Sequence, residues 1–299
     1  MGAREGEGRQ DNREAVRSEN RSGDGFDLSR SEEKEVEQKL PPSVQVLHEA
    51  VRIQGRMEMD RSTSALVWSS LAAGLSMGFS VIVPALLQAR LPADPAWKLL
   101  ATSGYAVGFL IVVLARQQLF TENTMTAVLP FMTSPDGRSL MRLLRLWGIV
   151  LLGNLVGGAV FAFAIGHMPM LEPATYDALR ASATELLANA PWALFSKGII
   201  AGWLIATMVW LVTAEERSKA LVIIVLTWLV GLGGFAHVIV GAIEGLYLVF
   251  AGQVAFADFL IAFLLPTLAG NVVGGSLIFA LISHAQVRSD EEGEPPSNP

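Results

Sequence analysis

One histidine stands inside a long uncharged stretch, where its ring is the side chain best suited to handle a proton. His237 lies in the run GFAHVIVG, Gly234–Gly241. Among unperturbed side chains, only imidazole changes its charge close to neutral pH. A neutral core histidine with satisfied hydrogen bonds is the simpler alternative. Because glycines interrupt the helical pattern directly before this residue, we favour a ring that donates a hydrogen bond to an anion or exchanges a proton with it.

A polar cluster interrupts an apolar stretch in the first half of the chain as well. The run RQQLFTENT covers residues 116–124. We expect Thr121 to cap a helix that runs to Pro130, because a threonine oxygen accepts hydrogen bonds from the free N–H groups at a helix start. The same hydroxyl can also face a pore, and the two roles are compatible.

One serine motif suggests a different chemistry. Gly74–Gly78 reads GLSMG, which matches the G-x-S-x-G pattern of serine hydrolases. That pattern belongs on a turn between a strand and a helix, whereas here it lies in an apolar helical stretch. An intramembrane serine hydrolase with His237 as its base would need Ser76 within hydrogen-bond reach of the ring. We keep this reading as a minor alternative.

The composition describes the elements that must position these residues. The chain has 299 residues, 52% of them hydrophobic, and no cysteine, so disulfides and thiol chemistry are excluded. We expect no metal and no cofactor. A helix needs roughly 20 apolar residues to cross a bilayer. Four runs meet that length with no charge except Lys197, namely residues 65–87, 146–166, 191–212 and 259–283.

Two further apolar segments are about twice as long as one span requires. Residues 97–133 and 218–253 are each interrupted near the middle by one of the clusters described above. We therefore predict an all-α polytopic membrane protein with six transmembrane helices, of which the second and fifth are broken. Irregular backbone at membrane depth is tolerated only inside protein or along a cavity, so the two breaks mark the site.

An internal repeat relates the two halves of the chain. GNLVGGAVFAFAIGH at 153–167 resembles GNVVGGSLIFALISH at 270–284. Three intervening spans make the copies run in opposite directions, which predicts an inverted 3+3 repeat with a binding site at the repeat interface. An aquaporin-like channel for neutral solutes is an alternative, but it requires Asn-Pro-Ala at both breaks, and neither break has it.

Charges outside the spans predict the domain boundaries and the orientation. We expect a disordered charged tail at 1–42, an amphipathic lead-in helix at 43–61, the six-span domain at 62–284 and a second disordered tail at 285–299. Lysine and arginine gather on the flanks that share a side with both termini, which places the termini in the cytoplasm. The starts of two half-helices would meet at the breaks, and their N–H groups favour a small anion.

The motifs LFTENT and GFAHVIVG and the glycine-rich third and sixth spans resemble the formate/nitrite transporter family. The resemblance covers about residues 62–283, and the extended RQQLFTENT and the lead-in HEAVR at 48–52 resemble its less-studied bacterial branch. It implies an aquaporin-like outline and a homopentamer with one pore per protomer in the bacterial cytoplasmic (inner) membrane. It also implies transport of small monovalent weak-acid anions, channel-like or coupled to protons, with the lipid bilayer as surroundings, and neither an enzyme nor a nucleic-acid partner.

The resemblance also assigns residues. His237 matches the central histidine of the family, and Thr121 matches the threonine of its mobile loop. Further loop residues are Leu119, Phe120, Glu122 and Asn123, and the constrictions fall at Tyr105, Phe109, Val230 and Phe235. We expect the anion to cross these constrictions as, or nearly as, the neutral acid.

Three features depart from the better-known members of the family. Gly241 stands where they have asparagine, and no lysine occurs between the third and fourth spans, so Lys197 either replaces their vestibule lysine or reaches the membrane surface. Arg116, Glu122 and Glu244 add charges at membrane depth. We expect Arg116 to pair with one of the two carboxylates, since buried charges are costly unless paired. The alternatives are a free Arg116 that attracts anions, or one that reaches the lipid headgroups while Glu122 complements the helix start.

Overall fold

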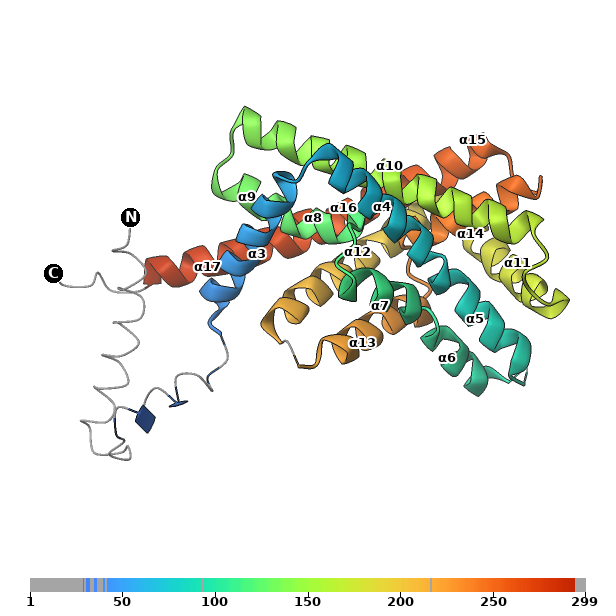
Figure 1. The fold of residues 1–299 in the computed structure, drawn as a ribbon, viewed down its shortest axis with the longest axis horizontal. Helices are drawn as coiled ribbons and strands as arrows, with labels where there is room; N and C mark the ends of the chain where they lie inside the picture. Colours follow the sequence, from blue (N-terminus) through green and yellow to red (C-terminus); the bar gives the residue numbers. More distant parts are fainter. Residues whose placement is uncertain are drawn as a thin grey trace. The chain divides into compact units, whose positions relative to one another are not determined.

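The computed structural model describes residues 42–92, 94–215 and 217–293, together with residues 29, 31, 32, 35, 36 and 40. Most of the tail predicted at 1–42 therefore lies outside the described residues. The chain divides into two units, Met1–Pro42 and Ser43–Pro299, and all that follows concerns the second unit. It is almost entirely helical (Figure 1).

The first repeat begins where the Ser62 hydroxyl accepts a hydrogen bond from the Ala65 N–H and caps the first span. Its helices are α4 (Thr63–Met77), α5 (Phe79–Arg90), α6 (Pro95–Ser103), α7 (Ala106–Leu114), α8 (Phe120–Thr126), α9 (Val128–Thr133) and α10 (Gly137–His167). The second span is thus divided between α7 and α8, as the sequence predicts.

The second repeat follows the helix α11 (Pro173–Leu187), which the sequence analysis did not predict. Its helices are α12 (Pro191–Ala214), α13 (Lys219–Leu232), α14 (Val238–Phe250), α15 (Phe256–Asp258), η1 (Phe259–Leu264), α16 (Leu265–Val272), η2 (Val273–Ala280) and α17 (Leu281–Gly293). The last five form one continuous span in which η1 and η2 are π-helical, a wider winding that occurs mostly as short insertions.

Among the described residues, five stretches are long and apolar enough to cross a membrane, and the two halves of the fifth span, α13 and α14, are shorter apolar helices. The six-span prediction is therefore confirmed, with the second and fifth spans broken. The last span runs on as α17 to Gly293, beyond the predicted boundary at 284. The predicted tail at 285–299 is thus wrong over residues 285–293, and residues 294–299 lie outside the described residues.

Glycines set the closest helix crossing in each repeat. A Cβ on Gly74 of α4 would lie 2.2 Å from the Asn154 carbonyl oxygen of α10. A Cβ on Gly202 of α12 would lie 2.3 Å from the Asn271 carbonyl oxygen of α16. Small residues let helix backbones approach where lipid supplies no hydrophobic drive. The matching crossings, α4 over α10 (Figure 1) and α12 over α16, show that the two repeats pack alike.

The lead-in helix α3 (Val44–Met59) starts at Ser43, whose hydroxyl accepts a hydrogen bond from the Val46 N–H. It packs on α8, α9, α12 and α17 (Figure 1). A Cβ on Gly55 would lie 1.8 Å from the Thr126 carbonyl oxygen, so α3 lies directly against the half-helix that follows the first break. We call this end of the molecule the α3 side.

Candidate functional site

The first break, between α7 and α8, is closed by a left-handed turn. The Arg116 N–H donates to the Val113 carbonyl at 3.2 Å, and the Gln117 N–H donates to the Val112 carbonyl at 2.9 Å. Arg116 has a φ of 51° and is the one non-glycine residue with positive φ in the described part of the chain. A left-handed residue after the last turn is a common way to end a helix. The chain then runs extended to Leu119, and α8 begins at the next residue.

The second break, between α13 and α14, repeats this backbone. Gly234 has a φ of 58°, and the Phe235 N–H donates to the Val230 carbonyl at 3.0 Å. The chain then runs extended to His237, and α14 begins at the next residue. His237 therefore occupies the position that Leu119 holds in the first break.

Asn154, a completely buried residue of α10, holds the first break from the side. Its Oδ1 accepts a hydrogen bond from the Phe120 N–H at 2.9 Å. Its Nδ2 donates to the carbonyls of Gln118 at 2.9 Å and Ser70 at 2.8 Å. Backbone groups that leave a helix at membrane depth need new partners, and this one side chain supplies them on both sides of the break.

Asn271 of α16 does the same for the second break. Its Oδ1 accepts from the Val238 N–H at 2.9 Å, and its Nδ2 donates to the carbonyls of Ala236 at 2.8 Å and Gly198 at 2.9 Å. The sequence analysis did not assign a role to either asparagine. The signal was present, because both follow glycine in the repeated GNxVGG motif and are polar residues inside apolar spans.

The two predicted pore residues are in contact. His237 Nε2 and Thr121 Oγ1 lie 2.8 Å apart, and both side chains are buried. The Val240 N–H donates to His237 Nδ1 at 3.4 Å, which assigns the hydrogen of the neutral ring to Nε2. Nε2 therefore donates to Thr121 Oγ1. The prediction that Thr121 caps its helix is wrong, because Leu119 holds the cap position and Thr121 lies within α8.

Apolar rings surround this pair. The Phe109 ring is fully buried and meets the His237 ring edge to face, with ring centroids 5.0 Å apart. Tyr105 lies next to Phe109, with ring centroids 5.6 Å apart. Tyr105, Val230 and Phe235 line the approach to His237. All four residues predicted as constrictions thus lie close to the histidine or along its approach.

A cavity of about 470 Å³ leads to His237. We call it the vestibule. Its walls come from α5, α6, α11, α12 and the second break, which ends at His237. Glu244, which lies two turns further along α14, faces the same space. The helix that prediction missed, α11, therefore forms a wall of the site.

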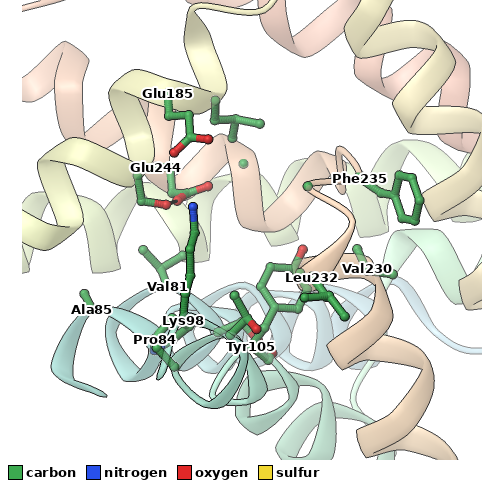
Figure 2. A pocket seen from close by; sticks show the side chains of 18 of the residues that line it. Val81, Pro84, Ala85, Lys98, Tyr105, Glu185, Val230, Leu232, Phe235 and Glu244 are labelled. Carbon is green, nitrogen blue, oxygen red and sulfur yellow. Dashed lines mark hydrogen bonds between the residues drawn. The ribbon is translucent and has the colours of Figure 1, made fainter. Parts of the chain in front are cut away.

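Charged side chains of both signs line the vestibule. Lys98, Lys197, Glu185 and Glu244 all contribute to its walls, and Figure 2 shows Lys98, Glu185 and Glu244 pointing into one space. Lys197, the predicted substitute for a vestibule lysine, does line the cavity, and its Nζ donates to Asn189 Oδ1 at 2.7 Å. Sequence reasoning did not select Lys98 or Glu185, because a charge near a span end is ordinary.

The predicted pairing of Arg116 is not formed. Arg116 is exposed, and within the described ranges no carboxylate lies within 4 Å of its guanidinium. Glu244 instead accepts a hydrogen bond from the Ser182 hydroxyl at 2.8 Å, because α14 packs against α11. Glu122 lies in the first turn of α8, and its Oε1 is buried without a hydrogen-bond partner.

The remaining loop residues are fixed by packing. Leu119, Phe120 and Asn123 are all buried. The Phe120 ring meets the Trp147 ring edge to face at 5.8 Å. Asn123 Nδ2 donates to Gln118 Oε1 at 3.0 Å. These three loop residues are therefore held in the interior and are not among the residues that line the vestibule.

A carboxyl on α3 reaches the same half-helix from the other side. Glu58 accepts hydrogen bonds from the Thr126 hydroxyl at 2.6 Å and from Gln54 Nε2 at 3.0 Å. Burial raises the pKa of the Glu58 carboxyl above its ordinary value, and the hydrogen bonds from Thr126 and Gln54 oppose that rise. The sequence analysis missed this contact, because a glutamate in an amphipathic helix is ordinarily a side chain on the solvent-exposed face.

The geometry does not favour a hydrolase. Ser76 lies inside α4 and not on a turn after a strand, and the described residues contain no strand. The hydrogen-bond partner of His237 Nε2 is Thr121. The fold and the site together define an inverted-repeat membrane protein in which two broken spans meet at a buried histidine below an open vestibule. Membrane transporters and channels are built on this plan.

Comparisons with known proteins agree with that class. The family profile described as "Formate/nitrite transporter" matches residues 45–285, so the chain belongs to the formate/nitrite transporter family. The inner membrane protein YfdC of Escherichia coli (strain K12) is 48% identical over 254 residues, which cover 85% of this chain and 82% of that protein. The formate channel FocA of Haemophilus influenzae is 25% identical over 241 residues, which cover 70% of this chain and 82% of that channel.

The fold of this chain is also that of a solved structure described as a pentameric formate channel with formate bound. The two align with a TM-score of 0.64 at 20% identity, over 76% of this chain and 98% of that one. The predicted inverted-repeat, aquaporin-like architecture is thereby confirmed. Membership in a family of transporters favours neither the hydrolase nor the channel for neutral solutes.

Proposed function

We propose that the protein carries small monovalent weak-acid anions of the formate and nitrite class across a membrane, through the vestibule and past His237. The observation that carries the proposal is the hydrogen bond between His237 and Thr121, formed where the starts of α8 and α14 meet. A titratable ring is thereby placed at the end of an open cavity, inside apolar walls. Such a place suits a solute that changes between a charged and a neutral form.

The apolar residues next to His237 explain why the solute must be a weak acid. A bare ion in a dry, low-dielectric passage costs several kcal/mol even after relaxation. The neutral acid avoids most of that cost. The anion therefore enters the vestibule charged and crosses beside Phe109 and His237 as, or nearly as, the neutral acid. His237 supplies or stabilises the proton, while channel-like flux and proton coupling remain two forms of this mechanism.

The setting of the protomer forms part of the proposal. A relative named as an inner membrane protein and a neighbour described as pentameric support a homopentamer in the bacterial cytoplasmic membrane, with one pathway in each protomer. Lysine and arginine are enriched at the span ends on the α3 side, which supports a cytoplasmic location for this side and for both termini. The vestibule then opens to the outside.

Uptake by proteoliposomes tests this function. Formate, nitrite, acetate and lactate are offered to vesicles with the purified protein and to empty vesicles, from pH 5 to pH 8. We expect uptake of at least one of these anions to rise as the pH falls. The variant His237→Asn, which keeps a polar side chain but cannot titrate, should lose this pH dependence.

The control is His167→Asn, because His167 is an exposed histidine at the end of α10 that stacks on Phe163 away from the vestibule. It should behave as the unmodified protein does. Uptake equal to that of empty vesicles for all four anions would contradict the proposed function. An unchanged pH profile in His237→Asn would remove the histidine from the mechanism.

A further inference from the structure

The vestibule is not a simple trap for anions. Its charged lining consists of two lysines, Lys98 and Lys197, and two glutamates, Glu185 and Glu244. The formal charges cancel, and ionised carboxylates repel an incoming anion. A carboxyl group that carries its proton does not add to that repulsion.

Glu244 differs from Glu185 in its surroundings. Glu244 is partly buried in the wall formed by α14 and α11, whereas Glu185 is exposed. The Ser182 hydroxyl donates to Glu244 Oε1 at 2.8 Å, and the other oxygen, Oε2, has no hydrogen-bond partner within the described ranges. Neither lysine lies within 4 Å of a described carboxylate, so no ion pair neutralises Glu244.

Position along the helix links Glu244 to the histidine. Glu244 follows His237 by seven residues, which is two turns and about 10 Å along one face of α14. Gly241 lies between them on the same face and lines the same cavity. A Cβ on Gly241 would lie 2.3 Å from Phe263 Cζ, so this glycine lets its neighbours pack closely against α14. Because Glu244 and His237 both line the vestibule, a small solute beside Glu244 shares one cavity with the histidine.

The other groups around Glu244 complete the electrostatic setting. Lys98 comes from α6, Lys197 from α12 and Glu185 from α11, and Tyr105 brings a phenol. The helices α4, α5 and α10, which also pack on α14, give the vestibule no charged side chain in the described part of the chain. The lysines attract and orient an anion, and Glu244 is the one carboxyl held in the wall beside it.

We propose that Glu244 is the proton donor of the vestibule, which protonates a small carboxylate anion before the resulting acid moves on to His237. The inference rests on the proposed function. The O–H bond of the Glu244 carboxyl group breaks and an O–H bond forms on the anion, so a neutral acid and an ionised Glu244 result. Hydronium from the water at the open end of the vestibule restores the Glu244 proton. A donor held beside its acceptor acts at a far higher effective concentration than free protons at neutral pH.

Uptake of formate at two pH values tests the donor. Glutamine has the shape of glutamate but cannot carry the proton. In Glu244→Gln, the ratio of uptake at pH 7 to uptake at pH 5 should fall by roughly 100-fold, the lower end of what a positioned acid provides. In the control variant Glu172→Gln, which changes an exposed glutamate outside the vestibule, this ratio should stay unchanged. An unchanged ratio in Glu244→Gln, or the same loss in both variants, overturns the proposal.

A second measurement does not depend on transport. Infrared difference spectra are recorded when formate is added to the purified protein at neutral pH. A band of a protonated carboxyl group should decrease in the unmodified protein and in His237→Asn, and this change should be absent in Glu244→Gln. A change of the band without any uptake of formate by vesicles would contradict the proposed transport but not the role of Glu244 as a proton donor. Uptake without a change of the band would contradict the role of Glu244 alone. If neither uptake nor a change of the band is seen, both the transport and the donor are contradicted.

Discussion

The two breaks share one backbone and differ in their side chains. Arg116 and Gly234 hold the same left-handed position, and Asn154 and Asn271 make the same three kinds of hydrogen bond. At the position before the half-helix, however, one break has a leucine and the other has His237. The repeat thus builds a symmetric frame, and the chemistry comes from residues that break the symmetry.

The surroundings of the two half-helices differ as well. After the first break, α8 and α9 are held by α3 through Gly55 and Glu58. After the second break, α14 is covered by α11, which brings Ser182 against Glu244. One half-helix is therefore tied to a helix outside the repeat, while the other forms a wall of the vestibule. Variants that act on one break or on both separate the frame from these additions.

The largest expected effect is on the shared frame. In Asn154→Leu or Asn271→Leu, one backbone N–H and two carbonyl groups lose their partner. A buried polar group without a partner costs about 1–3 kcal/mol, so we expect each variant to lower the free energy of unfolding by about 3 kcal/mol or more. Unfolding in mixed detergent micelles measures this loss.

The control for this prediction is Thr207→Val. Thr207 is half-buried on α12, and its hydroxyl donates to the Trp203 carbonyl within the same helix, so its removal should change little. The frame is symmetric only if both asparagine variants are affected. A neutral result for either of them would show that the two breaks are held in different ways.

A smaller effect, of opposite sign at the two breaks, is expected at the left-handed positions. A Cβ at Gly234 meets no atom within 4 Å, so Gly234→Ala tests conformation alone and should destabilise by about 1–2 kcal/mol. Arg116→Gly removes the strain of a left-handed non-glycine residue. It also increases the conformational entropy of the unfolded chain, which lowers stability by up to about 1 kcal/mol. It should be neutral or slightly stabilising. The same unfolding assay measures both, and equal signs would contradict the comparison.

The smallest expected effect concerns the helix that holds only the first half-helix. Burial raises the pKa of Glu58, so the folded state favours the neutral carboxyl group. The stability that Glu58 contributes is therefore present below its ordinary pKa and is lost as the pH rises through its folded value. The difference in unfolding free energy between the unmodified protein and Glu58→Gln should shrink as the pH is raised.

Glu49→Gln provides a control of opposite sign. The hydrogen bond from Arg52 holds the pKa of the Glu49 carboxyl below its ordinary value, so its contribution is present above that value and fades as the pH falls. If both variants responded to pH in the same direction, the contact between Glu58 and Thr126 would not be an energetic link between α3 and the half-helix.

The sequence predicted the parts of this fold that depend on hydrophobic length and on repetition. Six spans, two breaks and the inverted repeat follow from apolar runs and from the paired GNxVGG motifs. The resemblance to a family matched His237 and Thr121 to pore positions one by one. Their hydrogen bond was not predicted, because nothing in their spacing along the chain brings them together.

Other parts depend on contacts that a sequence does not display. The helix α11 has the alternating polar composition of a surface segment, and only its packing on α5 and α14 makes it a wall of the vestibule. Arg116 stands where glycine is the expected residue, so its left-handed conformation gave no signal. The expected ion pair of Arg116 failed because Glu244 lies in the wall of the vestibule, against α11.

The hydrogen bond from the Val240 N–H to His237 Nδ1 makes the ring a structural part of the first turn of α14, in addition to its proposed role with the proton. A proton that arrives at Nδ1 takes away the lone pair that accepts this N–H. The first turn of α14 then loses its cap, or the ring must rotate away from Thr121. In the proposed mechanism, charging the histidine is therefore coupled to a change at the start of the half-helix, in its backbone or in the orientation of the ring.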